Sequence, residues 1–255
     1  MNFRILSSIF PRRIINKIER VLNARENPII FVCDEHKKSY SGALLAVTYM
    51  KDMESALTCV DTLKNEYNFL FYMIADAIDS REGIPTGSAR RMVKIAELLG
   101  KQLHLSSSQL WVLEHACVLR DIGKVKVSND ILLKKTVLSY EEWMMLKSHA
   151  QLGADMLKEF GVFPELVEVI ASHHESYDGD GYPLGLQGDE IPFLSRVLKV
   201  IDVYCAITSP RMYRMGFATR EEALIHLQEE RGKHFDPEVV DAFLEIDVES
   251  IDIQY

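Results

Sequence analysis

The segment from His173 to Pro183 contains the residues best suited to metal chemistry. It reads His-His-Glu-Ser-Tyr-Asp-Gly-Asp-Gly-Tyr-Pro and follows an apolar helical run. Imidazole nitrogens bind transition-metal ions, and glycines let a loop adopt dihedrals that other residues avoid. Two adjacent histidines alone would fit a solvated helix end better than a metal site. Together with the glycine-rich loop, however, they predict a metal site with a ligand lying over it.

Other residues with matching chemistry are spread along the chain. An ionised carboxylate in an apolar helix is costly to bury unless it is paired or bound to metal, so Asp202, inside the run 197–207, is a candidate. A salt bridge to an arginine and metal ligation are both open for this residue. The further candidates, in chain order, are Arg120, Asp121, Lys124, His149, Asp202, Arg211 and Arg214.

These residues must be positioned by helices, because helical periodicity dominates from Tyr67 onward and no strand-like alternation follows. Capping signals support three helix starts: Ser139 before Glu142, Thr219 before Glu222, and Asp236 before a proline. We therefore predict a mainly α protein whose residues 67–255 form an all-helical domain. The expected helices are 67–81, 86–102, 106–119, 139–147, 149–159, 164–174, 190–208, 219–231 and 236–245. Trp111 and Trp143 lie on apolar helical faces and are expected in the core.

The first 66 residues differ from the rest of the chain. They contain an amphipathic helix at 12–24, strand-like runs at 29–33 and 44–49, and a helical stretch at 53–63. Two strands and a helix bury too little surface to be stable alone. We interpret residues 1–66 as a small α/β appendage or a dimerisation element, through which a homodimer could form.

Composition excludes several classes of protein. The net charge of −9 over 255 residues argues against a nucleic-acid-binding surface. The four cysteines are scattered, which fits reduced thiols better than a disulfide framework. No apolar run is long enough to span a membrane, and the first residues lack the features of a signal peptide. A cytoplasmic protein without a transmembrane segment is expected.

Several motifs together resemble a known family. The chain contains D-I-G-K, H-x-x-x-G, H-H-E-x-x-D-G-x-G-Y-P and D-x-Y-x-A-x-T-S-x-R-x-Y-R in this order. This combination resembles the HD-GYP domain, the bacterial subclass of HD-domain phosphohydrolases that hydrolyse cyclic di-GMP. The resemblance covers about residues 67–245. It implies an HD-type helical fold and a centre of two or three metal ions, often iron or manganese, that activates water for attack on a phosphodiester.

The resemblance also implies roles for individual residues. Asp121 would be the bridging carboxylate, with Asp202 as a further carboxylate ligand. The imidazole ligands would be His149, His173 and His174. Lys124 would neutralise the scissile phosphate, and Gly181, Tyr182 and Pro183 would shape the ligand loop. Arg211 and Arg214 would meet a guanine edge or a phosphate.

Two departures from the family pattern affect one metal position. Arg120 stands where the family has a histidine before the aspartate, and Ser88 stands where an earlier histidine ligand is usual. One metal position would keep only Asp121 and Asp202, whereas the other keeps Asp121 and the three histidines. We expect one divalent ion, iron or manganese, with the second position empty. The guanidinium of Arg120 could take over the charge of the missing ion through charge-assisted hydrogen bonds, but it could not generate a hydroxide.

Three functions are compatible with this pattern. The first is a degenerate domain that binds cyclic di-GMP, or a partner such as a diguanylate cyclase, without fast hydrolysis. The second is an active phosphodiesterase with a reduced metal centre, to which Glu114, Glu175 or Asp178 could contribute ligands. The third is a protein-interaction module that binds no nucleotide. Retention of Lys124, the Gly-Tyr-Pro loop and both arginines places the first ahead of the second.

Overall fold

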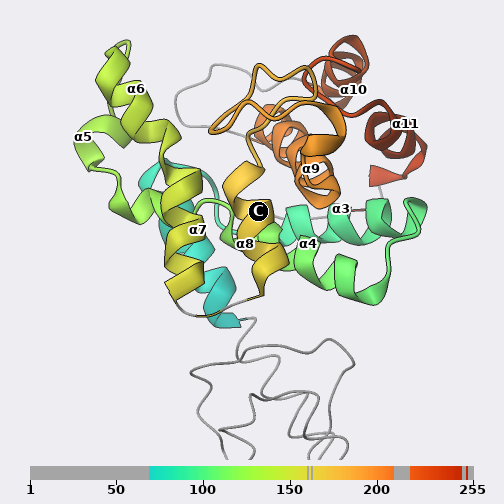
Figure 1. Cartoon of the computed structure of the whole chain (residues 1–255), viewed down its shortest axis with the longest axis horizontal. Helices are drawn as coiled ribbons and strands as arrows, with labels where there is room; N and C mark the ends of the chain where they lie inside the picture. The colour runs from blue at the N-terminus through green and yellow to red at the C-terminus, as the bar shows by residue number, and fades with distance from the viewer. Residues whose placement is uncertain (1–68, 160, 162, 210–218, 249–250, 252–255) are drawn as a thin grey trace, which may run out of the picture. The chain divides into compact units, whose positions relative to one another are not determined.

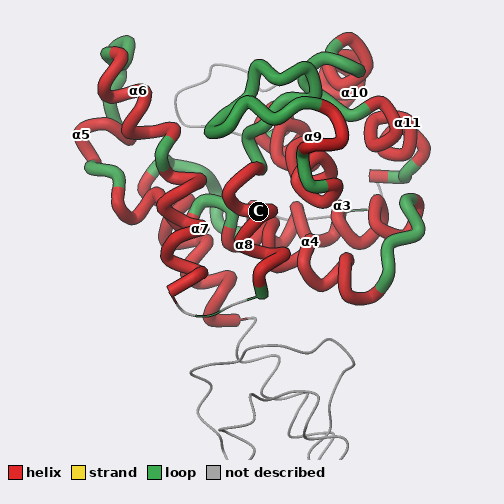
Figure 2. The backbone as a smooth tube through the Cα atoms, in the orientation of Figure 1, coloured by secondary structure: helices red, strands yellow, loops and turns green. Residues whose placement is uncertain are grey.

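A computed structural model describes residues 69–159, 161, 163–209, 219–248 and 251. This part of the chain is helical, with turns and loops but no β-strand (Figure 2). The mainly α fold class is confirmed. The predicted appendage at 1–66 lies outside the described residues, so its α/β character and the domain boundary stay predictions. No described helix is long and apolar enough to cross a membrane.

The observed helices follow the predicted ones closely. A helix covers residues 69–81, and the named elements follow it (Figure 1). They are α3 (Ser88–Gln102), α4 (Ser107–Leu119), α5 (Asn129–Leu132), α6 (Tyr140–Lys147), α7 (His149–Glu159), α8 (Pro164–Ser172), α9 (Phe193–Thr208), α10 (Arg220–Glu229) and α11 (Pro237–Glu245), with 3-10 turns η2 (Ile122–Lys126) and η3 (Gly188–Glu190). α5 and the two 3-10 turns were not predicted, because they are too short to show a period.

Side-chain caps fix the starts of α4, α6, α10 and α11. Ser139 and Thr219 each form a capping box with the glutamate three residues later, as predicted. Asp236 accepts a hydrogen bond from the backbone N–H of Glu238, and Pro237 occupies the first helical position. A third capping box, Ser106 with Gln109, starts α4. Each cap satisfies backbone donors that a helix start leaves unpaired.

The core lies around α9 and α4, which contact each other as well as α3 and α8. The C-terminal half of α4 is buried on all sides, from Ala116 to Leu119, and Arg120 directly after it is only 6% exposed. A charged side chain is rarely buried at a helix end that is itself fully buried. Arg120 must therefore find its partners inside the protein. Core side chains of α3, α9 and α11 include Met92, Ile95, Leu99, Val197, Leu198, Ile201, Val239, Val240 and Phe243.

The prediction that Trp143 belongs to the core is wrong. Its side chain lies on α6, which buries none of its residues, and is 44% exposed. Helical spacing alone predicts an apolar face on α6, whereas the packing shows that no residue of this helix is buried. α5 likewise buries no residue and contacts α6.

Candidate metal centre

The turn containing Asp121 packs directly against the start of α7. A Cβ atom placed on Gly123 would lie 1.9 Å from the carbonyl oxygen of His149, so only glycine allows this approach. Gly153, one helical turn further, also faces this contact, because a Cβ atom placed there would lie 3.1 Å from the backbone nitrogen of Gly123. As a result, Asp121 Oδ1 lies 3.4 Å from His149 Nε2. The glycines of D-I-G-K and H-x-x-x-G therefore allow the candidate metal ligands Asp121 and His149 to lie close together.

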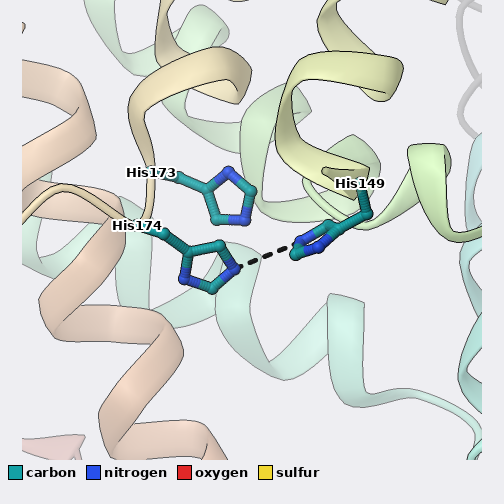
Figure 3. A group of neighbouring side chains, drawn as sticks. All are labelled: His149, His173 and His174. Carbon is teal, nitrogen blue, oxygen red and sulfur yellow. Dashed lines mark hydrogen bonds between the residues drawn. The ribbon is translucent and has the colours of Figure 1, made fainter. Parts of the chain in front are cut away.

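Three histidines from two helix boundaries converge at this point (Figure 3). His149 begins α7, whereas His173 and His174 follow the end of α8. His149 Nδ1 lies 2.7 Å from the carbonyl of Leu146, and His173 Nδ1 lies 2.6 Å from that of Ile170. A carbonyl can only accept, so both Nδ1 atoms donate and both Nε2 atoms carry the lone pair in the neutral ring. This arrangement is the usual one for a histidine that ligates metal through Nε2.

The histidine cluster fits a metal ion. One ligand atom from each ring lies within 4.8 Å of the others, and two of the rings are buried. In the described part of the chain, His173 Nε2 is buried without a hydrogen-bond partner, which is rare for a buried nitrogen. Burial, reinforced by His149, lowers the pKa of His173 to about 4, so its ring stays neutral as metal binding requires. His174 Nε2 lies 3.1 Å from His149 Nε2 and can donate to it. With the nearby Asp121 carboxylate, these are the donors that the sequence assigned to one metal position.

The ammonium group of Lys124 is paired within the protein. Its Nζ atom lies 2.7 Å from Glu82 Oε1 and 3.1 Å from Asp121 Oδ1. Burial would lower the pKa of Lys124, but Asp121 and Glu82 outweigh it and raise this pKa. Burial likewise opposes ionisation of Asp121, yet Lys124 and Arg120 hold the pKa of Asp121 well below its ordinary value. Asp121 is therefore an ionised carboxylate placed between cations and the histidine cluster.

Arg120 lies where two carboxylates of the predicted second metal position meet. Its Nε atom donates to Asp202 Oδ1 at 2.7 Å, and Nη2 lies 3.3 Å from Asp121 Oδ2. Nη1 donates to the carbonyl of Cys117 at 2.8 Å. These contacts use both edges of the guanidinium and leave it 6% exposed. Asp202 therefore forms a salt bridge to an arginine in the structure, and its role as a metal ligand stays a prediction.

Asp79 is a third carboxylate in the surroundings of Arg120, and it was not among the residues predicted from the sequence. It is 2% exposed and accepts a hydrogen bond from the hydroxyl of Ser88. Burial raises the pKa of Asp79, and Arg120 acts in the opposite direction. The signal for Asp79 was available, because it follows Ile78 inside an apolar helical stretch just as Asp202 does. Ser88 thus contributes a hydroxyl to this carboxylate at the position where the motif resemblance implies a histidine.

The loop after the histidines is held by hydrogen bonds from its backbone to the side chain of Glu175. The carboxylate of Glu175 accepts from the N–H groups of Leu184, at 2.7 Å, and Leu186, at 3.1 Å. Glu175 therefore organises the loop, and both of its oxygens are already engaged by backbone donors. A Cβ atom on Gly181 would lie 2.1 Å from the backbone nitrogen of Ser176, which explains a glycine there. The Tyr182–Pro183 peptide bond is cis.

Tyr182 covers one side of the histidine cluster. Its ring stacks on His174 with centroids 4.7 Å apart and planes inclined by 25°. Lys199 of α9 fixes the backbone at His174 and Glu175. Its Nζ donates to the carbonyl of His174 at 3.1 Å and to that of Glu175 at 2.7 Å. The sequence analysis did not identify Lys199. Arg211 and Arg214 lie outside the described residues.

The chain matches the model of a known protein family. Residues 72–239 match the HD domain family, which accounts for well over half of the 255 residues. The chain belongs to the HD domain family. The resemblance to its HD-GYP subclass, inferred from the motifs, is confirmed by the relatives.

Two relatives illustrate the similarity of this HD domain. The chain is 38% identical over 173 residues to the cyclic di-GMP phosphodiesterase response regulator RpfG of Xanthomonas campestris, covering 67% of this chain and 46% of that protein. It is 30% identical over 223 residues to 3'3'-cGAMP-specific phosphodiesterase 2 of Vibrio cholerae, covering 85% of this chain and 42% of that protein. The chain thus spans less than half the length of either relative.

A solved structure shares the fold. The cyclic GMP-AMP specific phosphodiesterase V-cGAP3 of V. cholerae matches with a TM-score of 0.54 and 23% identity, covering 69% of this chain and 47% of that one. At this identity the match supports the HD-type helical fold of the described residues.

Proposed function

We propose that this HD domain recognises cyclic di-GMP, or a closely related cyclic dinucleotide, with a single divalent ion and without fast hydrolysis. The position of Arg120 supports this proposal most strongly. Its guanidinium, held by Asp202 at 2.7 Å and Asp121 at 3.3 Å, supplies positive charge where the family pattern implies a second ion. A guanidinium has no exchangeable water to activate, so the charge of the pocket is balanced while a hydroxide source is lost.

The residues proposed to hold the ion are Asp121, His149, His173 and His174. A bound divalent ion would lower the pKa of a water molecule and offset charge on a phosphodiester. Imidazoles suit iron, and carboxylates suit manganese, so the mixed donor set is compatible with either. Asp202 is assigned to Arg120 rather than to the ion in this proposal.

The protein itself supplies orientation and charge. Lys124, although paired with Glu82 and Asp121, keeps a cation next to the candidate ion, and we propose that it meets the phosphodiester. Gly181, Tyr182 and Pro183 would shape the loop over the ligand. Arg211 and Arg214 would meet a guanine edge or a phosphate. A diguanylate cyclase or another signalling protein is the proposed partner, and the cytoplasm is the proposed compartment.

A slow phosphodiesterase is the second candidate function. It is favoured by the intact histidine cluster, whose buried His173 Nε2 has no hydrogen-bond partner among the described residues. A single ion could then suffice for turnover.

One pair of measurements separates the two functions. Calorimetry with cyclic di-GMP on the metal-loaded full chain should show binding, and chromatography should detect no linear dinucleotide or GMP beyond the level of a His173→Ala variant. Binding should be lost in Arg211→Ala and kept in His226→Ala, a histidine on α10 that contacts Phe235 instead of the cluster. Turnover that His173→Ala abolishes would establish the phosphodiesterase instead. Absence of both metal and nucleotide binding would leave a protein-interaction module.

A further inference from the structure

α6 presents an exposed aromatic ring beside the ammonium group of Lys147. Trp143 is 44% exposed, and no residue of α6 is buried. The Nζ atom of Lys147 lies 5.4 Å from the centroid of the Trp143 ring and 4.7 Å from that of Tyr182. Among the described residues, no carboxylate lies within ion-pair distance of Lys147. An exposed aromatic ring beside a cation can bind a ligand that is both aromatic and anionic.

This pair is continuous with the histidine cluster. Lys147 ends α6 two residues before His149, and the Tyr182 ring under its ammonium group stacks on His174 at 4.7 Å. A row of side chains therefore runs from the candidate metal ligands outward: His174, Tyr182, Lys147 and Trp143. α6 and α5 lie together at one edge of the described helices (Figure 1).

The chemistry of this row suits a nucleotide. Every nucleobase has a π face that stacks on an exposed aromatic ring, and a nearby cation compensates the phosphate of the same nucleotide. The net charge of −9 disfavours anionic ligands over the molecule as a whole, so binding must depend on local cations such as Lys147. The ring of Tyr182 already contacts both His174 and Lys147, whereas Trp143 retains exposed surface.

We propose that Trp143 is the stacking surface for one purine base of the cyclic dinucleotide and that Lys147 meets the adjacent phosphate. This inference rests on the proposed function, because it assumes that a dinucleotide binds over the histidine cluster. It assigns α6 the role of a base-binding edge that extends the site beyond the Gly-Tyr-Pro loop. A protein docking on the exposed residues Val137 and Tyr140 of the α5–α6 region is the competing occupant. The Lys147 cation and the continuity with the histidines favour the nucleotide.

Tryptophan fluorescence tests the contact directly. The chain has two tryptophans, so Trp111→Phe leaves Trp143 as the only one. Titration of metal-loaded Trp111→Phe protein with cyclic di-GMP should change the Trp143 emission with the same Kd that calorimetry gives, because a base stacks on the indole. Inorganic phosphate should leave the emission unchanged. Binding seen by calorimetry with no change in emission would overturn the proposal.

Affinity measurements complete the test. Trp143→Ala should weaken cyclic di-GMP binding by about 5- to 150-fold, as expected for the loss of one base stack. Trp143→Phe should retain most of the affinity, and Lys147→Met should both weaken binding and reduce its dependence on salt. Met145→Ala is the matched control, since Met145 is 47% exposed on the same helix but two residues from Trp143, where side chains do not share a face.

The outcomes separate this inference from the function on which it rests. If the wild-type chain binds no cyclic dinucleotide, both are overturned. If it binds and Trp143→Ala behaves like Met145→Ala, the base-binding edge is wrong while the proposed function stands. Metal content measured on the same variants should be unchanged, because neither Trp143 nor Lys147 is a proposed ligand.

Discussion

Arg120 donates from Nε to Asp202 Oδ1 at 2.7 Å, which joins the end of α4 to the middle of α9. Asp121 and Asp79 lie near the same guanidinium, and its positive charge acts to lower the pKa of both carboxyl groups. A buried cation thus holds together carboxylates that would otherwise repel each other. Charge compensation of this kind is the role that a metal ion usually has in such a pocket.

Removing the Arg120 guanidinium should destabilise the protein severely. Arg120→Ala leaves Asp202 and the buried Asp79 without this cation, and leaves Asp121 with Lys124 alone, so the free energy of unfolding should fall by about 3–5 kcal/mol. Urea unfolding followed by circular dichroism measures this change. Arg231→Ala, which breaks an ion pair with Asp241 on the surface, is the control and should leave the urea midpoint unchanged. Equal effects of the two substitutions would contradict a compensating role for Arg120.

The wild-type chain should bind one divalent ion. Elemental analysis of freshly purified protein should find about one ion per chain, and His173→Ala should reduce this content to background. Because a ligand that binds only the folded state stabilises it, metal at about 100 times its Kd should add about 2.7 kcal/mol of stability, and His173→Ala should abolish this gain. Two or more tightly bound ions per chain would rule out the substitution of a metal by Arg120.

Restoring both histidines should restore the second metal position. The double variant Arg120→His with Ser88→His places imidazoles at the two positions where the family pattern has histidines, so metal content should rise toward two ions and hydrolysis of cyclic di-GMP should increase. Chromatography of the products and elemental analysis measure both effects. A further His173→Ala change in this background should remove the gained activity. A folded double variant with one ion and an unchanged rate would argue against a lost metal position.

Gly123 should tolerate no side chain. In Gly123→Ala the added Cβ would meet the backbone oxygen of His149 at 1.9 Å, so the Asp121 turn must move away from α7. We expect loss of metal binding and a marked fall in thermal stability. Gly100→Ala is the comparison, because its Cβ meets the end of a flexible leucine side chain at 2.9 Å and gains helix propensity of about 1 kcal/mol. If both variants retain wild-type metal content, the close contact is not needed for the site.

Cys205 should be inert in the folded protein. Burial raises the pKa of its thiol to about 12, and that of Cys117 is raised in the same direction. Since only the thiolate reacts, iodoacetamide at about pH 8 should leave the peptides containing both residues unmodified, as measured by mass spectrometry. The same peptides should be modified fully in urea. Labelling of Cys205 under native conditions would show that α9 opens around it.

The sequence by itself determined much of the helical architecture. Its apolar periodicity and caps located the long helices to within a few residues, because these signals are local and Ser139, Thr219 and Asp236 act on their own helix starts. The motifs also identified the family and named the three histidines that converge. Short elements such as α5 escaped detection, since four residues show no period.

Only the tertiary structure decided how the charges are paired and which faces are covered. Asp202 pairs with Arg120, which lies 82 residues away in the chain. The folded chain likewise pairs Lys124 with Glu82, brings Asp79 near Arg120 and leaves Trp143 44% exposed. Local patterns record which residues are apolar or charged, whereas partners distant in sequence determine what each of them contacts.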